Sequence, residues 1–98
     1  RWVDATATAP ARLFGLEAKG EIRPGADADI VVFDPDATRR LGARDLHSRA
    51  DHSPYETRTV TGWPALTLSR GRRVAENGEP ADVRPGWGRF VARRPVAC

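Results

Sequence analysis

The 98-residue sequence contains no methionine and a single cysteine, Cys98, which is its last residue. One cysteine cannot close an internal disulfide, and with only two distant histidines it cannot complete a zinc site. We therefore interpret Cys98 as a reduced thiol of a cytoplasmic protein. Because the chain begins at Arg1 and lacks methionine, we expect it to be a processed product or a piece of a longer chain.

Long apolar runs and a strong charge of one sign are also missing. No segment approaches the roughly 20 apolar residues of a membrane span, and no secretory signal is present, so no membrane partner is expected. Basic residues exceed acidic ones only by 16 to 13, and the two kinds are interspersed. The densest basic cluster, Arg70, Arg72 and Arg73, lacks the accompanying aromatic residues and basic runs of a nucleic-acid interface, which favours a solvated turn.

What the sequence does contain is a short helical start. Ninety-eight residues make one domain at most. Residues 2–14 predict a helix with an interruption, because Pro10 suits the first turn of a second helix. Gly15 is well placed to end that helix in a left-handed conformation, whereas Ala9 is a poor helix cap.

Strand signals follow the helical start. The run 30–33 is apolar and bounded by acids, which predicts a strand buried on both faces that stops at 34–36. Weaker or interrupted strands are expected at 16–22, 38–41, 60–61, 65–69 and 72–76. Two turns are expected between the later strands, at Arg70-Gly71 and at Asn77-Gly78.

The chain is too small and irregular for a closed barrel. We predict a mainly β fold, a partial β-sandwich whose remaining strands come from elsewhere, with a short helical segment at the N-terminus. The expected division is a helical segment at 1–15, the sandwich portion at 16–80 and an extended tail at 81–98. Trp87 and Phe90 are the expected anchors of the tail.

The two histidines, His47 and His52, lie five residues apart with Asp45 and Asp51 nearby. A metal site needs three or four ligands in a defined geometry, and no spacing typical of such sites is present. Ordinary loop residues are therefore the favoured interpretation.

Asp27 and Asp29 are spaced to lie on one side of an extended segment, where paired carboxylates could divide acid and base roles. They follow a Pro-Gly turn and precede a strand, so we favour a structural role such as accepting hydrogen bonds from turn amides. Ser48, Ser53 and Ser69 lack the context of an activated nucleophile. The residues alone thus predict no catalytic, cofactor-binding or metal-ligating site.

Three parts of the chain resemble one family. Pro10–Leu16 together with Lys19–Pro35 resembles the block that ends many amidohydrolase-superfamily chains, where the last barrel helix leads into a small β-sandwich. The other two parts are similar to the dihydropyrimidinase and hydantoinase branch: Asp51–Glu56 with Val60–Pro64, and Ser69–Val74 with Asn77-Gly78 and Gly86–Phe90. The chain departs from the family pattern at Ala9, where Asn is usual, and at Thr57, where Gly is usual.

The resemblance implies that 1–15 is the end of the barrel's last helical segment and that 16–80 belongs to the composite β-sandwich of metal-dependent hydrolases. It also implies that the parent protein hydrolyses cyclic amides with a pair of divalent metals, usually zinc bridged by a carboxylated lysine. All the ligands would lie in the barrel, upstream of Arg1. The implied partners are this missing barrel and further copies of the parent.

Two alternatives stay open. The parent could be a non-catalytic relative in which this segment serves assembly, because the residues that would decide are absent from the chain. A basic nucleic-acid-binding module built on Arg70, Arg72 and Arg73 is the less favoured reading.

Overall fold

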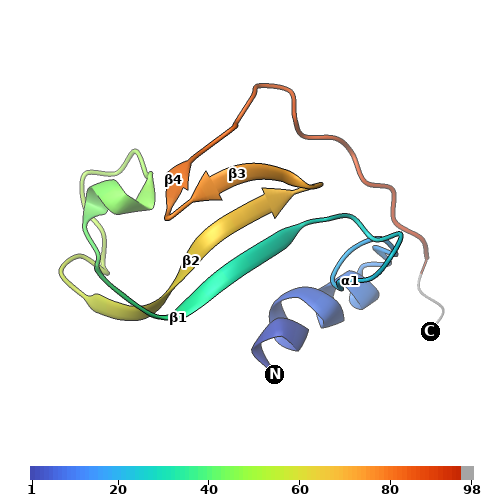
Figure 1. Ribbon diagram of the computed structural model, residues 1–98, viewed down its shortest axis with the longest axis horizontal. Helices are drawn as coiled ribbons and strands as arrows, with labels where there is room; N and C mark the ends of the chain where they lie inside the picture. The colour runs from blue at the N-terminus through green and yellow to red at the C-terminus, as the bar shows by residue number, and fades with distance from the viewer. Residues whose placement is uncertain (96–98) are drawn as a thin grey trace.

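The computed structural model describes residues 1–95, so Cys98 lies outside the described residues. A short helical segment and a four-stranded sheet make up the regular structure (Figure 1). The elements in chain order are the π-helical stretch η1 (Asp4–Thr8), α1 (Ala9–Leu13), β1 (Ile30–Arg40), the 3-10 helix η2 (Ala43–Leu46), β2 (Thr59–Ser69), β3 (Arg72–Glu76) and β4 (Glu79–Pro80). The predicted mainly β fold class is confirmed.

The sheet is antiparallel throughout, with the strand order β1-β2-β3-β4. β1 is one edge, and its pairing with β2 runs from Ile30 opposite Leu68 to Arg40 opposite Thr59. Strands that follow one another in the chain are therefore neighbours in the sheet. The N-terminal helical segment lies beside one end of this single layer (Figure 1).

The predicted stop of the first strand at 34–36 is wrong, because β1 continues to Arg40. The carboxylate of Asp34 accepts hydrogen bonds from the main-chain N–H groups of Asp36 (3.0 Å) and Ala37 (3.2 Å). This local turn takes up the extra residues as a bulge between Asp34 and Thr38, after which pairing with β2 resumes. The predicted strand at 38–41 is thus the second half of β1.

The strands expected at 60–61 and 65–69 are one strand, because β2 runs continuously from Thr59 to Ser69 and passes through Trp63-Pro64. Pro64 pairs with Phe33 immediately beside a register shift. Proline cannot donate to a strand ladder and is tolerated where the ladder is irregular, so β2 passes through it.

The N-terminal helical segment has no break, contrary to the prediction. Val3, Thr8 and Ala9 all have right-handed helical angles. The wider η1 turn ends at Thr8, two residues before Pro10, and such widening relieves the clash of a proline ring with the preceding turn. The predicted end at Gly15 is confirmed: Gly15 has φ +66°, and the N–H of Leu16 donates to the Ala11 carbonyl at 2.8 Å.

The weak strand expected at 16–22 is absent from the described structure, where the segment forms turns. The Lys19 N–H donates to the Leu16 carbonyl (3.1 Å), and this local bond replaces a strand ladder. Gly20 has φ +82°, and a Cβ there would lie 2.5 Å from the Cβ of Ala11. Glycine therefore lets this segment close against the helical segment.

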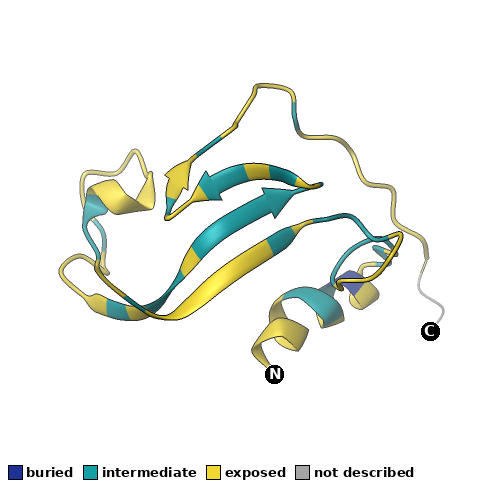
Figure 2. Cartoon of the chain, viewed as in Figure 1, coloured by how far each residue is buried: buried dark blue, intermediate teal, exposed yellow. Residues whose placement is uncertain are grey.

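Little of the chain is buried. Ala11, 6% exposed, is the only buried apolar residue among the described ones. The accessible surface is 8027 Å², whereas a compact 10.7 kDa monomer exposes about 5,500 Å². Val31 on β1 is 55% exposed, because this strand is an edge of the sheet and is not covered within the chain (Figure 2).

Candidate functional site

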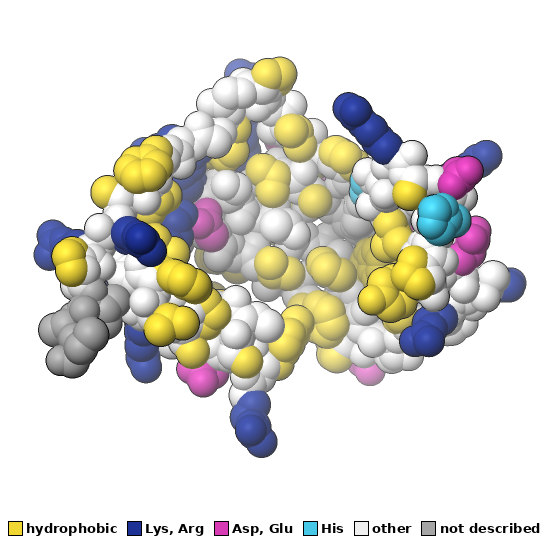
Figure 3. Space-filling model, turned by 180° about the vertical axis from the view of Figure 1, so that it is seen from behind, with side chains coloured by type: hydrophobic (Ala, Val, Ile, Leu, Met, Phe, Trp, Pro, Cys, Tyr) yellow, Lys and Arg dark blue, Asp and Glu magenta, His cyan; other side chains and the backbone are white. Residues whose placement is uncertain are grey.

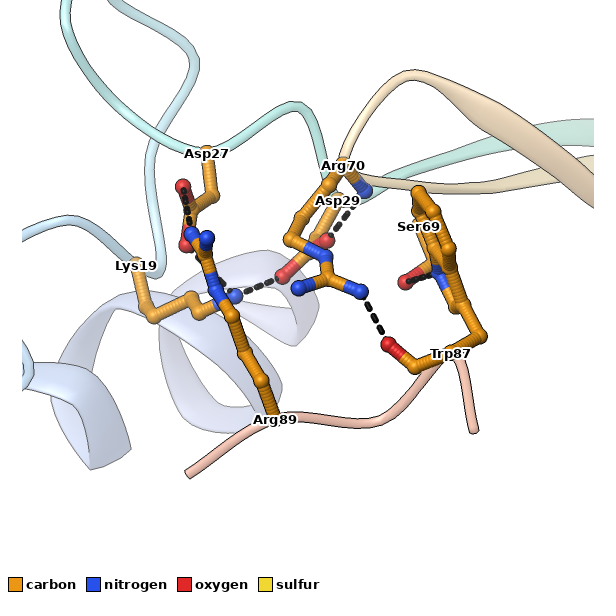
Figure 4. A network of polar contacts seen from close by, with 7 residues as sticks. All are labelled: Lys19, Asp27, Asp29, Ser69, Arg70, Trp87 and Arg89. Carbon is orange, nitrogen blue, oxygen red and sulfur yellow. Dashed lines mark hydrogen bonds and ion pairs between the residues drawn. The ribbon is translucent and has the colours of Figure 1, made fainter. Parts of the chain in front are cut away.

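Both predicted turns around β3 are present, and they differ in their surroundings. Arg70 and Gly71 have φ +47° and +78°, and Asn77 and Gly78 have φ +53° and +89°. Two consecutive left-handed residues match the twist of a tight hairpin. The Arg70–Gly71 turn is the meeting point of three segments that are distant in the sequence (Figure 4).

The first of these segments carries Lys19 and two aspartates. The ammonium group of Lys19 forms an ion pair with Asp27 at 2.8 Å and a second one with Asp29. The other carboxylate oxygen of Asp29 accepts a hydrogen bond from the main-chain N–H of Arg70 at 2.8 Å. Asp29 therefore bonds a turn amide, which confirms the structural interpretation of this residue.

The carboxylate of Asp29 and the ammonium of Lys19 stabilise each other's charged forms. The pKa of Lys19 lies above its ordinary 10.5, chiefly because it donates to Asp27 and then to Asp29. The pKa of Asp29 lies below its ordinary 3.8, chiefly because it accepts from Lys19, with a further contribution from the Arg70 amide. Both shifts move the groups away from neutral pH, so the pair is suited to holding segments together rather than to transferring protons.

The turn itself is the second segment, and the tail is the third. The indole N–H of Trp87 donates to the Ser69 hydroxyl at 3.1 Å, and the Arg70 guanidinium donates to the Trp87 carbonyl. The guanidinium carbons of Arg70 and Arg72 lie 4.2 and 4.8 Å from the centroid of the Trp87 ring. Trp87 is thus confirmed as a tail anchor. We call Lys19, Asp27, Asp29, Ser69, Arg70, Trp87 and Arg89 the clasp.

Phe90 is not an anchor, and this prediction is wrong: the residue is 91% exposed. The tail is instead held by polar contacts on either side of it. Arg89 lies 3.9 Å from Asp27, and the Arg94 N–H donates to the Gly15 carbonyl at 3.0 Å. A Cβ on Gly15 would collide with the carbonyl oxygen of Arg94, so the glycine that ends the helix also admits the tail.

The basic cluster Arg70, Arg72 and Arg73 is engaged in contacts within the chain. Arg70 and Arg72 are stacked on Trp87, and Arg73 forms ion pairs with Glu76 (3.1 Å) and Asp82 (3.8 Å). These guanidinium groups contribute to the fold of the chain. Sequence reasoning missed this role, although an arginine-rich turn followed by a tryptophan in a Gly-rich tail is a usable signal for stacking.

The two histidines lie apart and have different partners. The imidazole of His47 donates to the Gly78 carbonyl at 2.8 Å, and that of His52 donates to the adjacent Asp51 at 3.0 Å. Within residues 1–95, no cluster of three histidine, cysteine, aspartate or glutamate residues could hold a metal. The described residues therefore do not fit a metal centre.

The three serines also take part in local contacts. The hydroxyls of Ser48 and Ser53 accept from the main-chain N–H groups two residues later, each at 3.1 Å, and Ser69 accepts from Trp87. None of these described contacts pairs a serine with a histidine, as an activated nucleophile requires.

A small hollow of about 100 Å³ lies at the other end of β3. It is lined by Arg39, Arg40, Leu41, Asp45, Trp63, Asn77, Gly78 and Glu79. The indole N–H of Trp63 is buried there and has no acceptor among the described residues. Two arginines face two carboxylates in this lining, so its charge selects no class of ligand.

No helix in residues 1–95 combines the length and the apolar character that crossing a membrane requires.

Comparison with known proteins places these features in a family context. A family model described as "Amidohydrolase family" matches residues 1–75. The D-hydantoinase of Streptomyces coelicolor is 45% identical over 94 residues, which are 95% of this chain and 20% of that protein. The dihydropyrimidinase of Rattus norvegicus is 43% identical over 98 residues, which are 99% of this chain and 19% of that protein.

The fold agrees with these matches. A crystal structure of D-hydantoinase superimposes with a TM-score of 0.89 at 37% identity, covering 99% of this chain and 21% of that one. The chain thus spans about a fifth of the length of the relatives it matches.

Proposed function

Because the chain belongs to the amidohydrolase family, we propose that it is the C-terminal, non-catalytic part of a metal-dependent cyclic amidohydrolase. The whole protein would hydrolyse a C–N bond in a ring such as a hydantoin or a dihydropyrimidine. This assignment follows the hydantoinases and dihydropyrimidinase to which the chain is similar.

The likeness to D-hydantoinase extends over 95% of this chain but over only 20% of that relative. The side chains described above are engaged in turns, ion pairs and stacking, which are structural tasks. The chemistry would therefore belong to the remaining four-fifths of a whole protein of similar length.

The metal is assigned to that remainder as well. When bound, a divalent metal pair would activate water and polarise the ring carbonyl, and zinc is the metal that the resemblance implies. His47 and His52 do not converge on one point, and each has its own hydrogen-bond partner.

The role of the chain would be to support the barrel that the resemblance implies. The helical segment 1–15 would be the end of the barrel's last helix. Trp2 packs edge-on against Phe33 of β1, with ring centroids 4.9 Å apart, and so connects this segment to the sheet. Gly62 makes room for Phe33, because a Cβ there would lie 2.5 Å from the ring.

The uncovered apolar side chains support this role. Trp2 is 60% exposed and Leu13 71% exposed, and apolar side chains are spread over the face of the molecule seen in Figure 3. A monomer seldom leaves such a surface in water. We propose that the remaining strands and the barrel of the whole protein cover it, and that whole proteins assemble further into oligomers.

The test compares the 98-residue chain with the whole protein that contains it. We expect the whole protein to bind metal stoichiometrically and to hydrolyse hydantoin or dihydrouracil, and the chain alone to do neither. The double variant His47→Ala/His52→Ala in the whole protein is the matched control, and its metal content should be unchanged.

Two outcomes would change the assignment. Stoichiometric zinc with turnover in the isolated chain would contradict a non-catalytic role. A whole protein that assembles without metal and without turnover would instead favour the alternative of a non-catalytic assembly protein.

A further inference from the structure

Asn77 is the only carboxamide side chain in this sequence, which contains one asparagine and no glutamine. It is followed directly by Gly78 in the turn between β3 and β4, and it is exposed. Within residues 1–95 its side chain takes part in none of the described hydrogen bonds. The carboxamide is therefore accessible to water and to its own backbone.

The chemistry available to this pair is an intramolecular cyclisation. The main-chain nitrogen of Gly78 gives up its proton and attacks the carboxamide carbon of Asn77, and the new C–N bond closes a succinimide ring. The carboxamide C–N bond breaks, and its nitrogen takes up the proton and leaves as ammonia. Water then opens the ring on either side and yields aspartate or isoaspartate. Glycine at the second position leaves the attack unhindered because it has no side chain, and water is the only reagent consumed.

The local structure makes this turn easy to open. The Gly78 N–H donates to no acceptor in the described structure. The strand ladder beyond it consists of two residue pairs, Ala75 with Pro80 and Glu76 with Glu79, and Pro80 has no N–H to donate. Opening the turn also breaks the hydrogen bond from the Asn77 N–H to the Ala65 carbonyl (2.9 Å), and the bonds from Ala81 to Val74 (3.0 Å) and from Asp82 to Arg73 (3.2 Å) hold the segment after β4. Ring closure needs Asn77 to rotate out of its left-handed conformation, so it proceeds from the opened hairpin. Openings of such weakly paired ends require little free energy.

The consequences would reach the segment that contains η2. The Gly78 carbonyl accepts the hydrogen bond from His47 at 2.8 Å, and Gly78 lies against the ring of Trp63, where a Cβ would be 3.1 Å from the indole nitrogen. Isoaspartate inserts a methylene into the main chain directly before Gly78. That extra atom displaces Gly78 and its carbonyl oxygen, and the ring of Trp63 leaves no room for Gly78 to move toward it.

We propose that Asn77 is a site of spontaneous deamidation and that its conversion to isoaspartate releases residues 43–47 from the sheet. The modification would act as a slow and irreversible change at one end of the molecule. The opposite end, held by the clasp, has no carboxamide and would be unaffected.

The first test follows the intact mass of the 98-residue chain and the ammonia released in mildly alkaline buffer. A single carboxamide makes the signal unambiguous. We expect conversion about tenfold slower in the native chain than in the same chain unfolded in urea, which corresponds to an opening free energy of about 1.4 kcal/mol. The Asn77→Gly variant keeps a residue suited to positive φ and should gain no mass.

Absence of deamidation in native buffer, or deamidation about a thousandfold slower than in urea, would overturn the assignment of Asn77 as a deamidation site.

The second test asks whether isoaspartate at position 77 releases residues 43–47. In a His52→Ala background, His47 is the only imidazole, because the sequence has two histidines.

We expect the His47 ring signal to move to that of an unpaired imidazole in the isoaspartate form. Amide hydrogen exchange at 43–47 should increase in the same form. The Asn77→Asp variant, which adds the charge without lengthening the main chain, should retain the His47 contact. An unchanged His47 signal in the isoaspartate form would overturn the proposed release, and the same readouts apply in the whole protein after peptide mapping.

Discussion

The two turns that flank β3 share a backbone geometry and differ in what surrounds them. In the Arg70–Gly71 turn, Arg70 forms hydrogen bonds with Asp29, 41 residues earlier in the chain, and with Trp87, 17 residues later. The Asn77–Gly78 turn is joined to a distant segment through His47. The same backbone preference for a tight turn thus occurs at two differently held ends, because long-range contacts decide how firmly a turn is held. We call the end with the Arg70–Gly71 turn the clasped end and the end with the Asn77–Gly78 turn the open end.

Removing the Trp87 side chain should have the largest effect on the difference in stability between the two ends. We expect Trp87→Ala to lower the stability of the clasped end by about 2 kcal/mol, because a half-buried ring, its hydrogen bond and two stacked guanidinium groups are lost together. Hydrogen exchange of the tail and of the Arg70 turn measures this. The matched control is Phe90→Ala, which should change stability by less than about 0.5 kcal/mol. Equal effects of the two variants would contradict the assignment of the anchor.

Asp29 gives the next largest effect. We expect Asp29→Ala to cost about 1.5 kcal/mol, because it removes the acceptor of the Arg70 amide and an ion pair that is partly exposed. Asp29→Asn keeps an acceptor and loses the charge, so it should cost about half as much. Asp51→Ala is the control, since Asp51 is fully exposed and bonds only its neighbour. Urea unfolding of the three variants would show whether this order holds.

The clasp should also depend on pH in a defined window. The pKa of Asp29 is lowered from 3.8, so its contribution is present above about pH 4 and is lost as the pH falls through the lowered pKa. The pKa of Lys19 is raised from 10.5, so its contribution is present below that value and is lost as the pH rises through the raised pKa.

Hydrogen exchange of the Arg70 turn, measured against pH, would reveal the two limits. Asp29→Asn should flatten the acid limit. An acid limit that persists in this variant would show that another carboxylate holds the clasp.

Thr57 allows the open end to be strengthened. Its φ is +69°, a conformation that is strained for a β-branched residue, and Gly is usual at this position in the resembling family. We expect Thr57→Gly to raise stability by about 0.5–1 kcal/mol. Thr59→Gly, in the extended strand β2, is the control and should lower stability by about 1 kcal/mol. Thermal unfolding distinguishes a gain from a loss.

The smallest effect should come from His47. We expect His47→Ala to cost about 0.5 kcal/mol, because it removes one exposed hydrogen bond to the Gly78 carbonyl. Faster hydrogen exchange confined to 43–47 would support this weak link. A cost as large as that of Trp87→Ala would remove the contrast between the two ends.

Prediction from sequence succeeded where short-range backbone chemistry decides the structure. Gly15, Arg70-Gly71 and Asn77-Gly78 end elements as expected, because each requires left-handed backbone that few residues adopt. It failed where a local signal competes with long-range pairing. Asp34-Pro35 is a stop signal by itself, yet its bulge keeps β1 in register with β2.

The clasp, too, could be predicted from the sequence only in part. The turn before Asp27 and Asp29 and the strand after them indicated a structural role, and the aromatic residues of the tail indicated that Trp87 and Phe90 anchor it. The sequence could not separate Trp87 from Phe90, because both are aromatic residues of an extended tail that contains Gly86 and Gly88. The difference arises only because Ser69, Arg70 and Arg72 lie beneath Trp87.

The sequence by itself determined the turns, the mainly β character and the likeness to a family, since these rest on backbone preferences and on residue identity along the chain. Only the tertiary structure decided that Lys19, Asp29, Arg70 and Trp87 meet. Their meeting depends on the sheet bringing the Arg70 turn beside the start of β1 and on the tail returning across it. Such contacts form between residues far apart in the chain, and no local pattern specifies them.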